Sequence, residues 1–253
     1  GKDSVRALSK LTHIKDGEVR ITSVPPLIVP IRELFADQDS EALETALRGH
    51  YREYRSTLEG SIRHLVEGFR VADIARKVVG VGSVGTRAWI MLLLGRDDGD
   101  PLFLQMKEAE SSVLEEHLGR SRFAAPGRRV VEGQRLMQAA SDSFLGWFSA
   151  TGIDGVRRAF YVRQLWDQKG SVEVEAMTRA RFEGYAEMCG WTLARAHART
   201  GDRIALAAYL GNGRSFDRAM EDFAEAYADQ SERDYEALQQ AAQAGTIRVE
   251  HGV

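Results

Sequence analysis

The sequence predicts an α+β protein in which a small antiparallel sheet is followed by a mostly helical region. Three observations support this. Residues 71–170 contain short runs of strand-forming residues separated by turns. Residues 1–70 predict a hairpin and helices, and residues 171–253 show the 3.6-residue periodicity of helices. We therefore expect three regions with these boundaries.

The composition is that of an ordinary globular protein, with 43% hydrophobic and 28% charged residues. A net charge of −3 provides no general attraction to nucleic acid or to anionic membranes. We see no signal peptide and no apolar run near the roughly 20 residues of a membrane span. The single cysteine, Cys189, excludes an internal disulfide and a cysteine-built zinc site. We expect a cytoplasmic protein without nucleic-acid or membrane partners.

The N-terminal region predicts elements that lead into the sheet. After a short helix, two strand-like runs flank the turn at residues 15–17, and this hairpin ends at Pro25-Pro26. Helices are expected over residues 40–58 and 61–68, followed by a strand over residues 74–79. The first of these helices has an apolar face formed by Leu43, Leu47, Tyr51, Tyr54 and Leu58.

The segment that follows, Val78-Val79-Gly80-Val81-Gly82-Ser83-Val84-Gly85-Thr86, has the G-x-G-x-x-G spacing of a phosphate-covering loop. In a dinucleotide-binding unit such a loop opens into a helix. In a protein-kinase-like fold it is the turn of a β-hairpin, and a later strand carries a phosphate-binding lysine. Residues 86–95 are bulky strand formers that end in a turn. This pattern favours the kinase-like fold.

The next strand, residues 102–107, supplies the lysine. Period-two alternation places Phe103, Gln105 and Lys107 on one face. Lys107 is our candidate for orienting the α- and β-phosphates, with a solvent-exposed lysine at a strand end as the alternative. A kinase-like site also needs a helical glutamate that pairs with this lysine. Glu132, in a helix expected over residues 128–140, is our first choice, and Glu115, in a helix expected over 111–118, is the second.

Two further strands, at residues 144–148 and 159–165, complete an expected sheet of five strands. The segment 163–171 then connects this sheet to the helical region. In the kinase-like reading, the backbone around Arg163 and Leu165 meets the adenine edge.

The C-terminal region predicts one helix from residue 177 to Gly201 and another over residues 215–243. His197 and Asp202 form a His-x-x-x-x-Asp pattern that resembles a catalytic loop, although a packed helix end explains both residues better. Apolar stripes are expected on both helices, and the first would make Cys189 a core residue. The stripes consist of Phe182, Tyr185, Cys189, Leu193 and Ala196, and of Phe216, Met220, Phe223 and Tyr227.

Several long motifs resemble the bacterial domain-of-unknown-function family 2252. They are residues 79–86, 103–109, 131–142, 161–165, 189–199 and 226–230. The resemblance covers nearly the whole chain and implies a relative of protein kinases and aminoglycoside phosphotransferases. Family members carry G-D-x-H-x-x-N and D-F-D-like segments upstream of the glycine loop, in a circularly permuted order. Neither segment occurs here, so the resemblance implies an incomplete or shortened kinase-like protein.

The resulting hypothesis is an ATP-dependent phosphotransferase that uses Mg²⁺ and acts on a small molecule or protein. Its nucleotide would contact the residues Gly80, Val81, Gly82, Ser83, Gly85, Thr86, Lys107, Arg163 and Leu165. An upstream segment or a second copy of the chain is expected to complete the cleft. The alternative is a non-catalytic kinase-like scaffold that binds a nucleotide or a partner protein.

Overall fold

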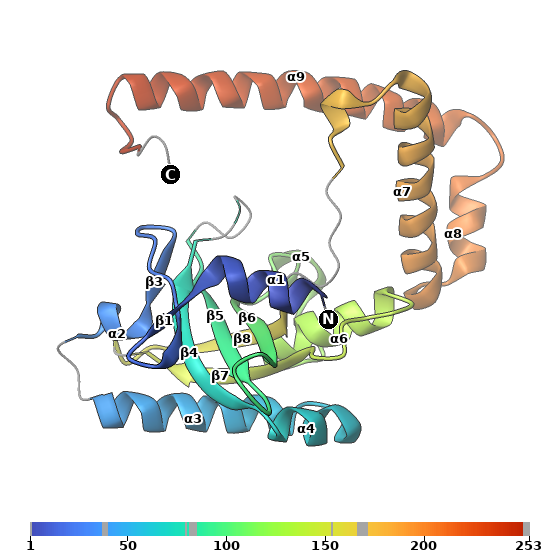
Figure 1. Cartoon of the computed structure of the whole chain (residues 1–253). Coiled ribbons are helices and arrows are strands. Elements are labelled where there is room, and N and C mark those ends of the chain that lie inside the picture. Colours follow the sequence, from blue (N-terminus) through green and yellow to red (C-terminus); the bar gives the residue numbers. More distant parts are fainter. Residues whose placement is uncertain are drawn as a thin grey trace. The chain divides into compact units, whose positions relative to one another are not determined.

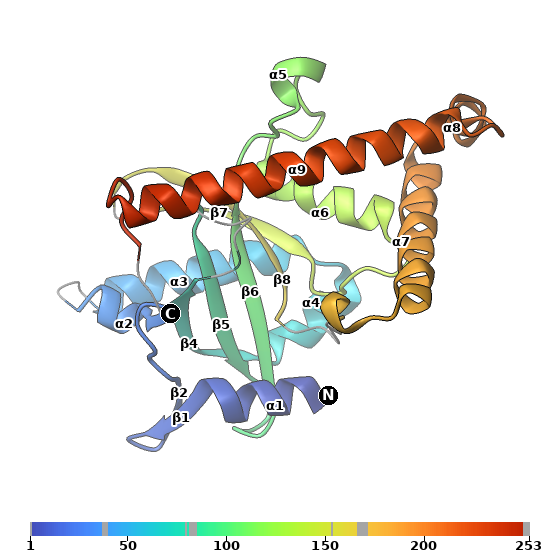
Figure 2. The ribbon, with the colours of Figure 1, turned by 90° about the horizontal axis from the view of Figure 1, so that it is seen from above.

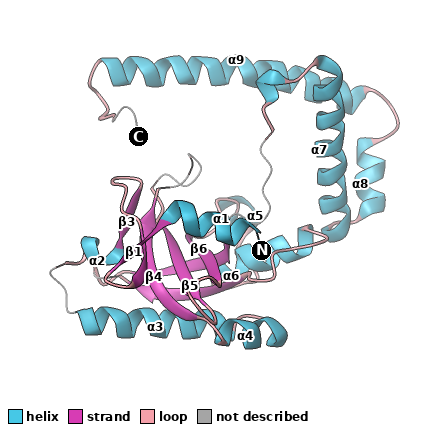
Figure 3. Cartoon of the chain, in the orientation of Figure 1, coloured by secondary structure: helices cyan, strands magenta, loops and turns pink. Residues whose placement is uncertain are grey.

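The computed structural model describes residues 2–36, 40–78, 80, 85–152, 154–165 and 172–249. The chain forms two compact units, Gly1–Tyr185 and Ala186–Val253. The first unit contains the sheets, and the described elements from residue 174 onward are all helical (Figure 3).

The first unit opens with helix α1 (Lys2–Leu11) and a two-stranded hairpin, β1 (Thr12–Lys15) and β2 (Glu18–Ile21). The turn between these strands holds Asp16 and Gly17 at φ angles of +52° and +80°. Two consecutive left-handed residues are what a tight hairpin requires, and this confirms the predicted turn. The elements that follow are β3 (Ile28–Pro30), α2 (Ile31–Leu34), α3 (Ser40–Ser56), α4 (Gly60–Glu67), β4 (Arg70–Lys77), β5 (Ala88–Leu94), β6 (Pro101–Ala109), α5 (Glu115–Leu118), α6 (Pro126–Met137), β7 (Gly146–Thr151) and β8 (Arg157–Gln164).

The main sheet has six strands, in the order β3-β4-β5-β6-β8-β7, and every neighbouring pair is antiparallel (Figure 1). The expectation of five strands is therefore wrong. The additional strand, β3, has three residues and ends in Pro30. A short run beside prolines carries a weak strand signal, and it is stable here as an edge strand paired with β4.

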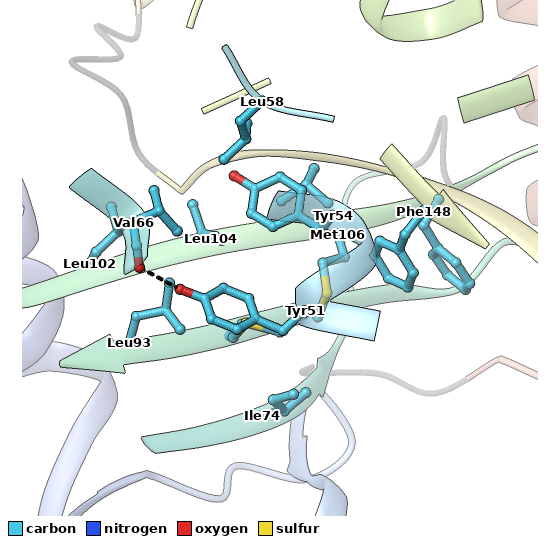
Figure 4. Close-up of a cluster of buried hydrophobic side chains, with 13 residues drawn as sticks. Tyr51, Tyr54, Leu58, Val66, Ile74, Leu93, Leu102, Leu104, Met106 and Phe148 are labelled. Atoms are coloured by element: carbon cyan, nitrogen blue, oxygen red, sulfur yellow. Dashed lines mark hydrogen bonds between the residues drawn. The ribbon is translucent and has the colours of Figure 1, made fainter. Parts of the chain in front are cut away.

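Helices cover both faces of this sheet (Figures 1 and 2). On one face, α3 and α4 bury Tyr51, Tyr54 and Val66 against residues of the strands (Figure 4). The Tyr51 hydroxyl donates to the Val66 carbonyl at 3.0 Å, and the Tyr54 hydroxyl donates to the Phe144 carbonyl at 2.8 Å. Burial raises the pKa of Tyr51 to about 12 and that of Tyr54 well above its ordinary value, so both remain neutral donors.

The opposite face carries α1 and the β1–β2 hairpin. Ala7 and Leu11 of α1 pack with Ile21 of the hairpin and with Leu94 and Phe103 of the sheet. The predicted apolar face of α3 and the alternation along β6 are both confirmed for the described residues.

Several predicted boundaries are wrong, and at two of them side chains bond to the backbone of turns. The strand expected from residue 144 begins at Gly146, since an Asp142 carboxylate oxygen accepts a bond from the Phe144 N–H at 2.8 Å. The helix expected over residues 111–118 is reduced to the four residues of α5. There the Ser112 hydroxyl accepts from the Leu114 N–H at 3.3 Å.

The remaining helices are a short 3₁₀ turn, η2 (Val174–Ala176), and then α7 (Arg179–Thr200), α8 (Arg203–Leu210) and α9 (Ser215–Gln243). No described side chain of these three α-helices is buried. Phe182 and Leu193 are 48% and 59% exposed, and Cys189 is half-buried, so the expected core stripe on α7 is wrong. Helical spacing reveals an apolar stripe, but it does not reveal what covers that stripe.

Candidate functional site

The glycine-rich segment joins two neighbouring antiparallel strands. β4 ends at Lys77, β5 begins at Ala88, and Arg76 lies opposite Trp89 in their register. A strand follows the segment where the dinucleotide-binding fold would have a helix, so that fold is excluded. Gly85 has a φ of +84°, a conformation that favours glycine. Val81, Gly82 and Ser83 lie outside the described residues.

Lys107 is half-buried and lies one strand away from this segment. In the register of the sheet it is opposite Ala88 on β5 and Tyr161 on β8. Its neighbour Met106 belongs to the cluster under α3, so Lys107 is on the opposite face of the sheet. Helix α6 is on this same face, since a Cβ on its Gly127 would lie 3.1 Å from the Cβ of Trp147, which is opposite Tyr161.

A second lysine, Lys77, shares this face and was not among the predicted residues. It follows Arg76, which is opposite Trp89, and Trp89 is opposite Met106 on the α3 side. Lys77 therefore points to the other side, as Lys107 does. It pairs with Ile28 of β3, and burial lowers its pKa. The sequence does place a lysine at the end of the strand before the glycines. The burial of this lysine, however, depends on the unpredicted strand β3.

On β8, the strand beside β6, Arg163 lies opposite Gln105, which is two positions from Lys107. The Arg163 Nε atom is buried and has no hydrogen-bond partner within the described part of the chain. Leu165 is buried, and its N–H donates to the Phe103 carbonyl at 2.9 Å. The Leu165 N–H is thus used within the sheet and is not directed at a ligand.

The two candidate glutamates lie on different elements. Glu132 is on α6, and its Oε1 is 3.9 Å from Arg128 Nε and 3.8 Å from Arg135 Nη1, both on the same helix. Glu115 begins the short helix α5. Neither ion pair of Glu132 is with Lys107, so a pair between Lys107 and either glutamate stays a prediction.

A hollow of about 730 Å³ opens beside the glycine segment. Gly85 and Arg87 form one side, the start of α6 at Pro126 forms another, and the ends of β6 and β8 form its floor. Its volume lies in the range of small-molecule sites. Its charged lining consists of Arg87, Glu108, Glu110, Arg157 and Arg158.

His197 and Asp202 belong to the second unit. The His197 carbonyl accepts from the Gly201 N–H at 2.8 Å, at the end of α7. The Asp202 carboxylate caps α8 by accepting from the N–H groups of Ile204 and Ala205 at 2.9 and 3.1 Å. Asp202 therefore has a side-chain role at a helix terminus, whereas His197 lies near the end of α7 with an exposed side chain, so the expected packing of His197 is wrong. A catalytic role for them stays a prediction.

The described residues contain no group of three or more histidine, cysteine, aspartate or glutamate side chains arranged to hold a metal ion. None of their helices is both long enough and apolar enough to cross a membrane.

Comparison with protein families gave one match. The family described as "Uncharacterized protein conserved in bacteria (DUF2252)" matches residues 1–241, so the chain belongs to this family. Comparisons with curated proteins and with solved structures returned no match.

Proposed function

We propose that this member of the DUF2252 family binds a nucleoside triphosphate on the lysine-bearing face of its sheet. One observation carries the proposal: Lys77 and Lys107 lie on the same face, on the strands that flank and adjoin the glycine-rich segment. Two cations on one face of the sheet suit a polyphosphate, since a lysine ammonium binds phosphate as a point charge.

The order of elements supports the kinase-like class of nucleotide site. The chain runs from strand β4 through the glycine-rich segment to β5, then to β6 with Lys107, α6 with Glu132, and the pair β7 and β8. A glycine-rich turn, a lysine strand and a glutamate helix in this order are the parts with which protein kinases hold ATP. The reaction class that fits is phosphoryl transfer from Mg²⁺-ATP. Carboxylate ligands for the Mg²⁺ are not assigned among the described residues.

The lowered pKa of Lys77 fits this proposal. Burial disfavours its charged form. A bound phosphate would supply an anion that favours the charged form again. Arg163 adds a buried donor, Nε, on the same face.

Calorimetric titration with a non-hydrolysable Mg²⁺-ATP analogue tests the proposal. We expect Lys107→Ala and Lys77→Ala each to weaken binding about tenfold to a hundredfold, the range for a hydrogen bond to a charged group. Lys15→Ala is the control, because the Lys15 side chain is exposed at the end of β1. Equal affinity of the lysine variants and the parent, with folded structure verified by circular dichroism, would disprove the assignment.

An ATP-consumption assay on the same proteins separates two versions of the function. Turnover that depends on Lys107 supports a phosphotransferase. Binding without turnover supports a nucleotide-binding scaffold of the same fold.

A further inference from the structure

The first unit contains a cavity of about 670 Å³ on the sheet face that looks away from Lys107. Helices α2 and α3 cover it, and the strands form its floor. Its lining is mainly apolar and includes Leu34, Ala46, Trp89, Met91, Met106 and Phe148. Figure 4 shows the labelled side chains of Ile74, Met106 and Phe148, which belong to the buried cluster under α3.

The size and lining of this cavity indicate a ligand site. Close-packed protein interiors leave few voids larger than a water molecule. Small-molecule sites instead occupy about 300–1,000 Å³, with a mainly apolar wall and a few placed polar groups.

His50 is one such polar group. Its ring stacks on Phe148 with 5.7 Å between the centroids, and burial lowers its pKa. The described residues provide no hydrogen-bond partner for its ring nitrogens. A neutral imidazole on an apolar wall can donate one hydrogen bond to a ligand oxygen and accept another.

The charges at the rim define the ligand further. Arg87 and Arg158 are neutralised: Glu108 contacts each of them at 3.4 Å, and Asp154 contacts Arg158 at 2.6 Å. Arg76 is exposed at the rim, and the described part of the chain offers it no ion pair. Among the described residues of the rim, Arg76 therefore carries the one positive charge that is not compensated. A planar guanidinium matches a carboxylate through two parallel hydrogen bonds.

We propose that this cavity binds a small amphipathic carboxylate, with an aliphatic body of medium-chain length on Met91 and Met106 and its head group at Arg76. The ligand and the triphosphate of the proposed function would occupy opposite faces of the sheet. This inference stands independently of nucleotide binding, because none of the cavity's lining residues is one of the two lysines.

The probe is decanoate, observed through ¹³C-methyl methionine NMR spectra. The chain has six methionines, of which Met91 and Met106 line the cavity and Met137, Met177, Met188 and Met220 do not. We expect saturable shifts of the Met91 and Met106 methyl signals alone. The absence of such shifts, or equal shifts at all six methyls, would overturn the proposal.

Two variants, a control variant and an uncharged analogue test the positions of the head group and of the aliphatic body. Arg76→Gln should weaken decanoate binding about tenfold, as expected for a charge-assisted bond, and leave binding of the uncharged 1-decanol unchanged. Arg70→Gln is the matched control, because Arg70 lies on the same strand and pairs with Asp98 at 3.1 Å. Ala46→Leu should reduce binding of both probes by filling the cavity. Tight binding of both probes to Ala46→Leu, with the parent's methyl spectrum otherwise retained, would place the ligand elsewhere and overturn the assignment.

Discussion

Lys107 lies directly opposite Ala88 in the antiparallel register of β5 and β6, and Ala88 is the first residue of the strand that follows the glycine-rich segment. Facing side chains of neighbouring strands have their Cβ atoms about 5 Å apart. Ala88 is 3% exposed, so Lys107 faces a covered position of the sheet, directly beside the start of the strand that follows the glycine-rich segment.

At Lys77 we predict that stability and nucleotide binding oppose each other. Its folded pKa is below the ordinary value of 10.5, so the folded state disfavours the proton. The neutral side chain of Lys77 makes its full contribution to stability above pH 10.5. That contribution is lost as the pH falls through the lowered pKa of Lys77. Lys77→Met should therefore raise the free energy of unfolding at pH 7 and weaken binding of the ATP analogue.

Urea unfolding of both proteins at pH 7 and pH 10 checks this prediction. The advantage of the variant should shrink at the higher pH. An advantage of equal size at both pH values would show that the charge of Lys77 is not its cause.

Gly127 and Gly133 provide a matched pair on α6, the helix that carries Glu132. A Cβ on Gly127 would collide with the carbonyl oxygen of Phe160 and lie 3.1 Å from the Cβ of Trp147. Gly127→Ala should therefore cost about 1–3 kcal/mol of stability. A Cβ on Gly133 meets nothing within 4 Å, so Gly133→Ala should stabilise the helix by about 0.5–1 kcal/mol.

Thermal unfolding of the two variants measures the difference. Similar changes in melting temperature for both would contradict the close contact between α6 and β8.

Asp73 is a buried carboxylate that joins three elements of the first unit. Its Oδ2 accepts from Arg32 Nη1 at 2.6 Å and from the Ile21 N–H at 2.8 Å, and its Oδ1 accepts from the N–H of Ile74 at 3.0 Å. Asp73→Ala would leave these donors without a partner, and we expect a loss of about 3–5 kcal/mol.

Asp98→Ala is the control for this loss. It removes an exposed pair with Arg70 at 3.1 Å, which should cost about 0–1 kcal/mol. Chemical denaturation at pH 7 compares the two variants. Equal losses would mean that Asp73 is no more important than a surface carboxylate.

The sequence predicted the strands whose signals are local. The alternation along residues 102–107 and the bulky run before Gly95 both correspond to observed strands, β6 and β5. β3 was missed because three residues next to prolines carry little pattern, and only pairing with β4 stabilises them.

The same missing strand explains the candidate-site residue that was overlooked. Lys77 is half-buried because it lies beside Ile28 of β3, a contact between positions far apart in the sequence. The cavity under α3 was also invisible, since its lining combines residues from α2, α3 and five strands of the sheet. Asp202, by contrast, followed a local rule, because an aspartate just before a helix is a common cap.

The last prediction concerns His50, whose pKa is lowered by burial against the ordinary value of 6.5, although Glu53 opposes the shift. The unfolded chain therefore takes up a proton at a higher pH than the folded chain. The contribution of His50 to stability is full above pH 6.5 and is lost as the pH falls through the lowered pKa. His50→Gln cannot titrate in this range, so its free energy of unfolding, relative to the parent, should rise between pH 7.5 and pH 5.

Urea unfolding of the two proteins at several pH values measures this difference, with His64→Gln as the control. His64 is exposed on α4 and lies 3.9 Å from Glu67, so its substitution should not reproduce the trend. Decanoate adds a second comparison, because a ligand that holds the neutral imidazole should enlarge the difference. The contrary result is that the free energies of unfolding of the parent and of His50→Gln fall equally as the pH is lowered. That result would show that this imidazole is already free to take up a proton in the fold.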